Sequence, residues 1–143
     1  MKRIVTLAIF MTAVGGVLGA APASAVPLPD PVRVSASDDY VRSTCQFNPT
    51  AAKGSILRGR LTATSQATWA GFKQVTHIEA RCFVNDSAGS AVAHLFAEGA
   101  RAAAGSQVVT VPLSPTYEVC LLTIYQRRGI QEEQFFLECA PRL

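Results

Sequence analysis

Residues 120–139 read CLLTIYQRRGIQEEQFFLEC, which is the pattern of a β-hairpin. Gly129-Ile130 suits a two-residue type II′ turn, because that turn prefers glycine at its first central position. With this turn, Cys120 lies directly opposite Cys139, at a separation that a disulfide can bridge. A longer loop over Arg127-Arg128-Gly129 would shift the pairing. We predict the shorter turn and a bridged hairpin.

The same register also places other side chains opposite suitable partners. On the cysteine face it forms two apolar pairs, Leu122 with Leu137 and Ile124 with Phe135. On the opposite face it sets Arg127 across from Glu132, an oppositely charged pair. A slip of one residue would scatter these pairs, so the pattern specifies the register. We expect Leu121, Tyr125 and Phe136 on the outer face, either as a contact surface or beneath another strand.

The chain before the hairpin consists of short β-type stretches separated by turn residues. Further strands are predicted over residues 32–36, 40–47, 55–65, 74–84, 91–98 and 107–113. Alternation within two of them gives inward faces made of Leu57, Gly59, Leu61 and Ala63, and of Ile78, Ala80, Cys82 and Val84. Residues 91–104 are ambiguous, because their many alanines also favour a helix. We predict a strand to Glu98 followed by a loop.

Seven or eight short strands at near-regular spacing predict an all-β fold, an antiparallel β-sandwich. The sandwich resembles an immunoglobulin-like domain in architecture only, since the cysteine spacing and the tryptophan position differ from those of antibody domains. All four cysteines follow residue 25, and the closest two are 19 residues apart. That spacing argues against zinc and for two disulfides. The hairpin pairs Cys120 with Cys139 and leaves Cys45 for Cys82.

The N-terminus has the pattern of a cleaved signal peptide over residues 1–25. Lys2 and Arg3 precede a charge-free apolar stretch, and Ala23 and Ala25 provide the small-x-small cleavage site. A membrane anchor is the alternative, but three glycines interrupt the stretch and the cleavage site follows it at once. A proline-rich lead-in over 26–31 and one domain over 32–143 would follow. We expect a secreted, extracellular protein without a stable membrane anchor.

Composition suits one globular domain, since 143 residues with 49% apolar and 16% charged side chains can bury a core. Removing residues 1–25 leaves 13 − 2 = 11 basic and 10 acidic residues, a net charge of +1. No long run of like charge remains, so we expect no nucleic-acid partner. The motifs of nucleotide-binding loops and serine hydrolases are absent, and we expect no cofactor and no metal.

His77, Glu79 and Arg81 form the sharpest polar constellation. Alternation places them on one face of a strand, about 7 Å between neighbours. Small secreted microbial ribonucleases resemble this in using an acid, a base and a guanidinium, although no longer motif of theirs matches. The simpler interpretation, which we favour, is the solvated outer face of a strand.

Trp69 and Phe72 lie in a loop between two predicted strands. They could anchor a binding partner, but we expect them to cover an open end of the sandwich, because a small domain has few large side chains. The sequence therefore predicts a non-catalytic extracellular binding module, with an inhibitor as one variant and an extracellular protein as its partner. A small hydrolase that uses the His77 strand, such as a ribonuclease, is the alternative.

Overall fold

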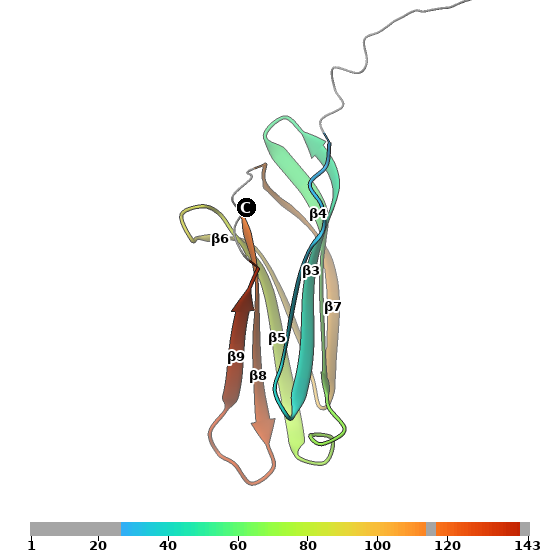
Figure 1. Cartoon of the computed structure of the whole chain (residues 1–143), viewed down its shortest axis with the longest axis vertical. Helices are drawn as coiled ribbons and strands as arrows, with labels where there is room; N and C mark the ends of the chain where they lie inside the picture. Colours follow the sequence, from blue (N-terminus) through green and yellow to red (C-terminus); the bar gives the residue numbers. More distant parts are fainter. Residues whose placement is uncertain (1–26, 114–116, 141–143) are drawn as a thin grey trace, which may run out of the picture.

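The computed structural model describes residues 27–113 and 117–140, which form a sandwich of two antiparallel sheets (Figure 1). The strands are β2 (Val32–Ser37), β3 (Val41–Lys53), β4 (Ile56–Ala67), β5 (Val75–Asn85), β6 (Ala91–Gly99), β7 (Ala102–Pro112), β8 (Glu118–Arg127) and β9 (Gln134–Cys139). The described residues contain no apolar helix of the length that a membrane span requires. The predicted signal peptide, residues 1–25, lies outside them.

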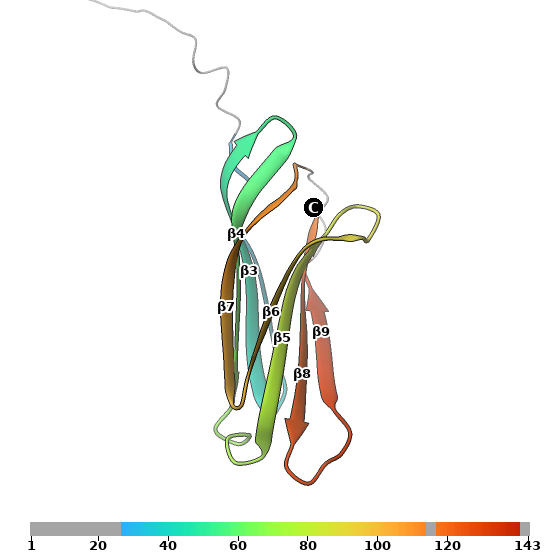
Figure 2. The same ribbon diagram turned by 180° about the vertical axis from the view of Figure 1, so that it is seen from behind.

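The first sheet has the strand order β2-β3-β4-β7 and the second the order β6-β5-β8-β9. Figures 1 and 2 show the two sheets as long layers, with the β3–β4 hairpin extending past the rest of the sandwich at one end. In immunoglobulin domains the first, second, fifth and fourth strands share a sheet. Here the first, second, third and sixth described strands do so. The strand order therefore differs from that of immunoglobulin domains, although both are antiparallel β-sandwiches.

The core lies between the sheets, and strict alternation produces it. The predicted inward faces of β4 and β5 are confirmed, because every one of their eight residues is buried. Phe47 and Tyr117 meet edge to face within the core, with ring centroids 5.7 Å apart. Three buried hydroxyls also lie inside, where Thr123 donates to Ser43 at 2.8 Å and Ser43 bonds Ser65 at 2.7 Å. These bonds satisfy each hydroxyl and join the two sheets.

The hairpin has the predicted register but a longer turn. Cys120 pairs with Cys139, Leu122 with Leu137 and Ile124 with Phe135. Regular pairing ends at Tyr125 and Gln134, so the two-residue turn was wrong. Instead the Ile130 amide donates to the Arg127 carbonyl at 3.1 Å, and Gly129 supplies the positive φ of 79° that this turn needs. Arg127 reaches Gln74 at 2.9 Å rather than its predicted partner Glu132.

The predicted orientation of the hairpin was also wrong. Leu121 and Tyr125, expected on the outer face as a contact surface or beneath another strand, are buried against the first sheet, so the second alternative holds for them. The opposite face points outward, and there Phe135 is 71% and Leu137 54% exposed. Both faces of the hairpin are apolar, so its own pattern does not distinguish them; contact with β2 and β3 of the other sheet does.

The alanine-rich segment is strand rather than helix, as predicted, but the loop expected after Glu98 was wrong. β6 continues to Gly99, and β7 already begins at Ala102. The link is tight because Gly99 lies close to the Ala102 backbone, where a Cβ atom would lie 1.9 Å from the Ala102 carbonyl oxygen. Small alanines let this edge of the sandwich close, since β6 and β7 belong to different sheets yet lie side by side.

Two disulfides are present, and they are those that the hairpin register predicted. Cys45–Cys82 joins β3 to β5 between the sheets, and both cysteines are fully buried. Cys120–Cys139 joins the neighbouring strands β8 and β9. Two disulfides are consistent with a protein of an oxidising, extracellular compartment.

Replacing Cys45 and Cys82 together with alanine should lower the melting temperature more than replacing Cys120 and Cys139. The first bridge spans 37 residues and the second 19. From loop entropy these correspond to about 4 and about 3 kcal/mol of stabilisation. The first pair also leaves a cavity in the core, which adds to the loss. Thermal unfolding of both double variants measures the difference, and an equal or greater loss for the hairpin pair would contradict it.

Candidate functional site

His77, Glu79 and Arg81 lie on the outward face of β5, in the middle of the second sheet. Arg81 Nη2 lies 3.4 Å from Glu79 Oε1, and the guanidinium also lies over the Phe96 ring at 5.2 Å. His77 Nε2 lies 3.3 Å from Glu98 Oε1 on the neighbouring strand β6. Glu98 was not predicted, because only the pairing of β5 with β6 brings it to this face.

These contacts pair each group with a local partner rather than aiming them at a common point. General acid–base cleavage of RNA needs an acid and a base in reach of the same reacting atoms. Here the Glu79 carboxylate is held by Arg81, and the His77 side chain, 40% exposed, turns toward Glu98. The arrangement is that of a solvated sheet face carrying one ion pair, Arg81 with Glu79, and a contact between His77 and Glu98.

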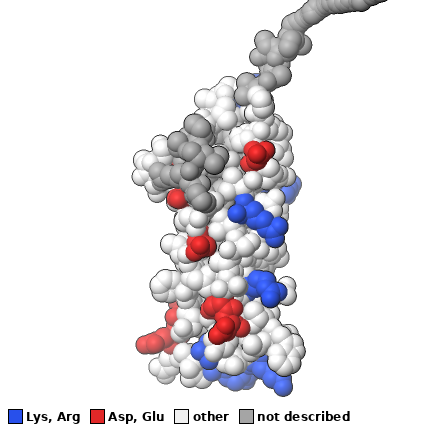
Figure 3. Space-filling view, in the orientation of Figure 1, with Lys and Arg blue, Asp and Glu red and all other residues white. Residues whose placement is uncertain are grey.

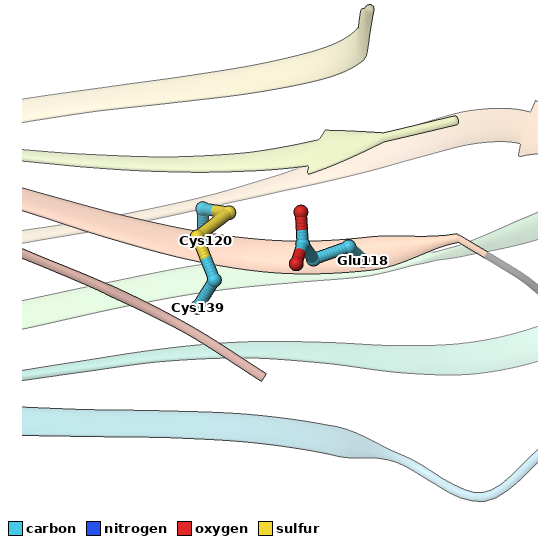
Figure 4. Close-up of side chains that lie close together, drawn as sticks. All are labelled: Glu118, Cys120 and Cys139. Carbon is cyan, nitrogen blue, oxygen red and sulfur yellow. A yellow bond between two sulfur atoms is a disulfide. The ribbon is translucent and has the colours of Figure 1, made fainter. Parts of the chain in front are cut away.

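Two other clusters contain side chains of the types found in metal sites or catalytic sites. Glu118, Cys120 and Cys139 place one ligand atom each within 4.8 Å of one another (Figure 4). Both sulfurs are bonded to each other, so they offer no thiolate to a metal. The hydroxyls of Ser43, Ser65 and Thr123 bond one another inside the core, and neither bond involves a histidine.

The loop after β4 departs most from expectation. We expected Trp69 to cover the end of the sandwich, and this was wrong. Its side chain is 96% exposed, and that of Phe72 is 57% exposed. The loop borders a shallow hollow of about 340 Å³ lined by Trp69, Ala70, Phe72, Lys73 and Gln74. An indole in this position contributes no burial to the fold, and it is free to bury its surface against another molecule.

The loop is nevertheless fixed to the β2–β3 turn. The Thr68 amide donates to the Tyr40 carbonyl at 2.9 Å, and the Thr68 hydroxyl donates to the Asp39 carbonyl at 2.6 Å. Gly71 lies against Tyr40, where an added Cβ atom would lie 2.2 Å from the Tyr40 carbonyl oxygen. Within the loop, the amides of Gln74 and Val75 both donate to the Gly71 carbonyl. Trp69 therefore projects from a braced loop.

A second set of bonds holds the turn beneath the loop. Asp38 accepts from the backbone amides of Tyr40 and Val41 at 2.8 and 2.9 Å, and from the Tyr125 hydroxyl. Burial, together with the neighbouring Asp38 carboxylate, raises the pKa of Tyr125 well above its usual value of 10. Tyr125 thus stays protonated as the donor that ties this turn to the second sheet.

Phe72 is positioned by a cation. The Arg101 guanidinium lies over its ring at 5.1 Å, and Arg101 Nε donates to the Phe72 carbonyl at 2.5 Å. Arg101 belongs to the tight β6–β7 link and was not among the predicted site residues. Only the strand pairing, which places that link beside residue 67, could have revealed it.

Replacing Gly71 with alanine should destabilise the domain by about 2 kcal/mol or more, since the new Cβ atom overlaps backbone that cannot retreat. Gly105→Ala is the matched control, because its Cβ atom would make ordinary 3.4 Å contacts with Ala97 and Leu95. Chemical denaturation of both variants measures the difference. An unchanged Gly71→Ala protein would show that the loop is not braced as described.

Comparison with known proteins adds no family assignment. No protein-family model matches the chain, and no curated protein matches it.

Proposed function

We propose that the exported chain is a secreted, non-catalytic binding module that contacts an extracellular protein through the loop of Trp69 and Phe72. The observation that carries the proposal is the 96% exposure of the chain's one tryptophan on a loop that the fold holds in place. Tryptophan and arginine are the residues that most often dominate protein interfaces. A braced loop also loses little conformational freedom when it binds.

The location of the loop supports this role. It lies at one end of the sandwich with the β2–β3 turn, and immunoglobulin-like domains also carry binding loops at the ends of their sheets. That analogy concerns architecture, not descent. The inhibitor variant of this function has less support. An inhibitor loop fills the cleft of another protein, whereas the loop of Trp69 itself borders a hollow.

The alternative, a small ribonuclease, has weaker support. Its trio His77, Glu79 and Arg81 belongs to one strand, where Arg81 contacts Glu79 while His77 contacts Glu98 on the neighbouring strand instead. The outward face of a half-buried strand carries charges by default.

Binding through the loop should depend on Trp69 and not on the exposed sheet face. Three proteins are immobilised and tested for binding to extracellular proteins of the source culture. They are the exported chain, Trp69→Ala and Phe135→Ala. Phe135 is the matched control, since it is an aromatic residue 71% exposed on the second sheet. A partner should be retained by the parent chain and by Phe135→Ala, and bind Trp69→Ala at least about thirtyfold more weakly. The reverse dependence would refute the assignment.

The purified chain should not cleave RNA. Incubation with a single-stranded RNA substrate, followed by gel analysis, measures this directly, and His77→Ala serves as the comparison. Cleavage that disappears in His77→Ala, with the melting temperature unchanged, would replace the binding module with the ribonuclease.

A further inference from the structure

The outward face of the first sheet carries positive charge and no carboxylate. Its cations are Arg33 on β2, Arg42 and Lys53 on β3, and Arg58 and Arg60 on β4. All five are exposed. The other outward positions of β2, β3, β4 and β7 hold hydroxyl, amide or apolar side chains, and no Asp or Glu stands among them. We name this surface, with its five cations, the basic face.

Acidic residues gather on the other sheet. Its strands carry Glu79, Glu98, Glu118 and Glu138, and its β8–β9 loop carries Glu132 and Glu133. Figure 3 shows basic side chains on the side of the first sheet, with an acidic group above them, further acidic groups toward the middle and the side of β8 and β9, and more basic side chains at the lower end. Among the described residues, Arg81 forms an ion pair with Glu79 and His77 contacts Glu98, and the basic face takes part in neither contact. Its charges therefore remain available to an outside anion.

The register spreads these cations over a flat area rather than concentrating them in one cavity. Arg58 and Arg60 alternate along β4, about 7 Å apart, and Arg33 lies two strands away, where it pairs with Gln46, which in turn pairs with Thr62 of β4. Arg60 Nη1 donates to Ser106 Oγ at 2.9 Å, which holds its guanidinium across β7. Such an array matches a long polymer with repeated negative charges better than a single small anion.

Two shallow hollows on the same face each lie between two cations. One, of about 380 Å³, is bordered by Arg33 and Arg42 with Ser35 and Thr44. The other, of about 310 Å³, is bordered by Lys53 and Arg58 with Ile56 and Thr110. Each combines charge with hydroxyl groups, which both donate and accept hydrogen bonds.

The side chains between the cations distinguish among polyanions. Single-stranded nucleic acid is held by stacking on aromatic rings, and no aromatic side chain points outward from these four strands. Specific reading of duplex DNA needs an element that enters a groove, whereas these cations are spread over three strands of one sheet. A membrane surface would need a broad apolar insertion, and the large exposed apolar side chains of these four strands are only Ile56 and Val108, while Trp69 lies on the end loop. Hydroxyl and amide groups between guanidinium groups suit sugar hydroxyls and their acidic substituents.

We propose that the basic face binds an acidic polysaccharide, a polymer of sugars carrying carboxylate or sulfate groups. The surface is distinct from the Trp69 loop, so the proposal stands or falls independently of the protein-binding function. Arg33, Arg42, Lys53, Arg58 and Arg60 contact the acidic groups, and the neighbouring threonine, serine and asparagine side chains bond the sugar hydroxyls.

Titration calorimetry of the exported chain tests this with polygalacturonate for carboxylate, dextran sulfate for sulfate, and neutral dextran. We expect binding to at least one acidic polymer, none to dextran, and a steep loss of affinity between about 50 and about 200 mM salt, because counterions are released. Which polymer binds identifies the acidic group. Failure to bind either acidic polymer, or equal binding of neutral dextran, would overturn the proposal.

Arginine variants then locate the surface. Arg58→Gln/Arg60→Gln should weaken binding about tenfold or more, and Arg33→Gln and Arg58→Gln should each weaken it several-fold. Arg128→Gln removes the same single charge at the end of the second sheet and should change affinity less than about twofold. An equal loss in Arg128→Gln would show attraction to net charge rather than to the basic face. Duplex DNA and vesicles of anionic phospholipid are the competing ligands, and comparable affinity for either refutes the polysaccharide.

Discussion

The bridge between Cys45 and Cys82 is the constraint on which the rest of the structure depends. It joins the sheets through their core, and its Cα atoms are 5.5 Å apart. Stacked sheets ordinarily lie about 10 Å apart. The strands around the bridge must therefore approach closely, and small side chains permit this: Ala63 pairs with Cys45, and Ala80 lies two residues before Cys82. Larger buried residues, Phe47 and Leu61, form the next inward pair along β3 and β4 and fill the core beside the bridge.

A feature of the fold could be predicted from the sequence where the interactions that determine it lie within one stretch of the chain. The strands, the inward faces of β4 and β5 and the hairpin register come from alternation and pairing, which a stretch of sequence contains. The orientation of the hairpin does not, because Leu121 and Leu122 are equally apolar and only the opposite sheet decides which is buried. The longer turn left the register unchanged since it is centred on the same residues as the predicted one.

The candidate sites show the same division. Alternation correctly placed His77, Glu79 and Arg81 on one face, but Glu98 joins them only through strand pairing. Nothing in the residues around Trp69 shows that a Tyr40 carbonyl lies under Gly71 and turns the indole outward. The basic face was invisible for a different reason. Its cations are spread over three strands and separated in the sequence by other residues, so no run of like charge appears, and a small net charge conceals two faces of opposite sign.

The dispersal of those arginines has an evolutionary consequence. Each one occupies an exposed position beside at least one buried neighbour, so exchanging it alters no core contact and costs little folding stability. Selection can thus strengthen or weaken this surface one codon at a time, while the buried positions beside it stay under the separate demand of packing. Descendants of this chain would be expected to diverge fastest in what they adhere to and slowest in how they fold.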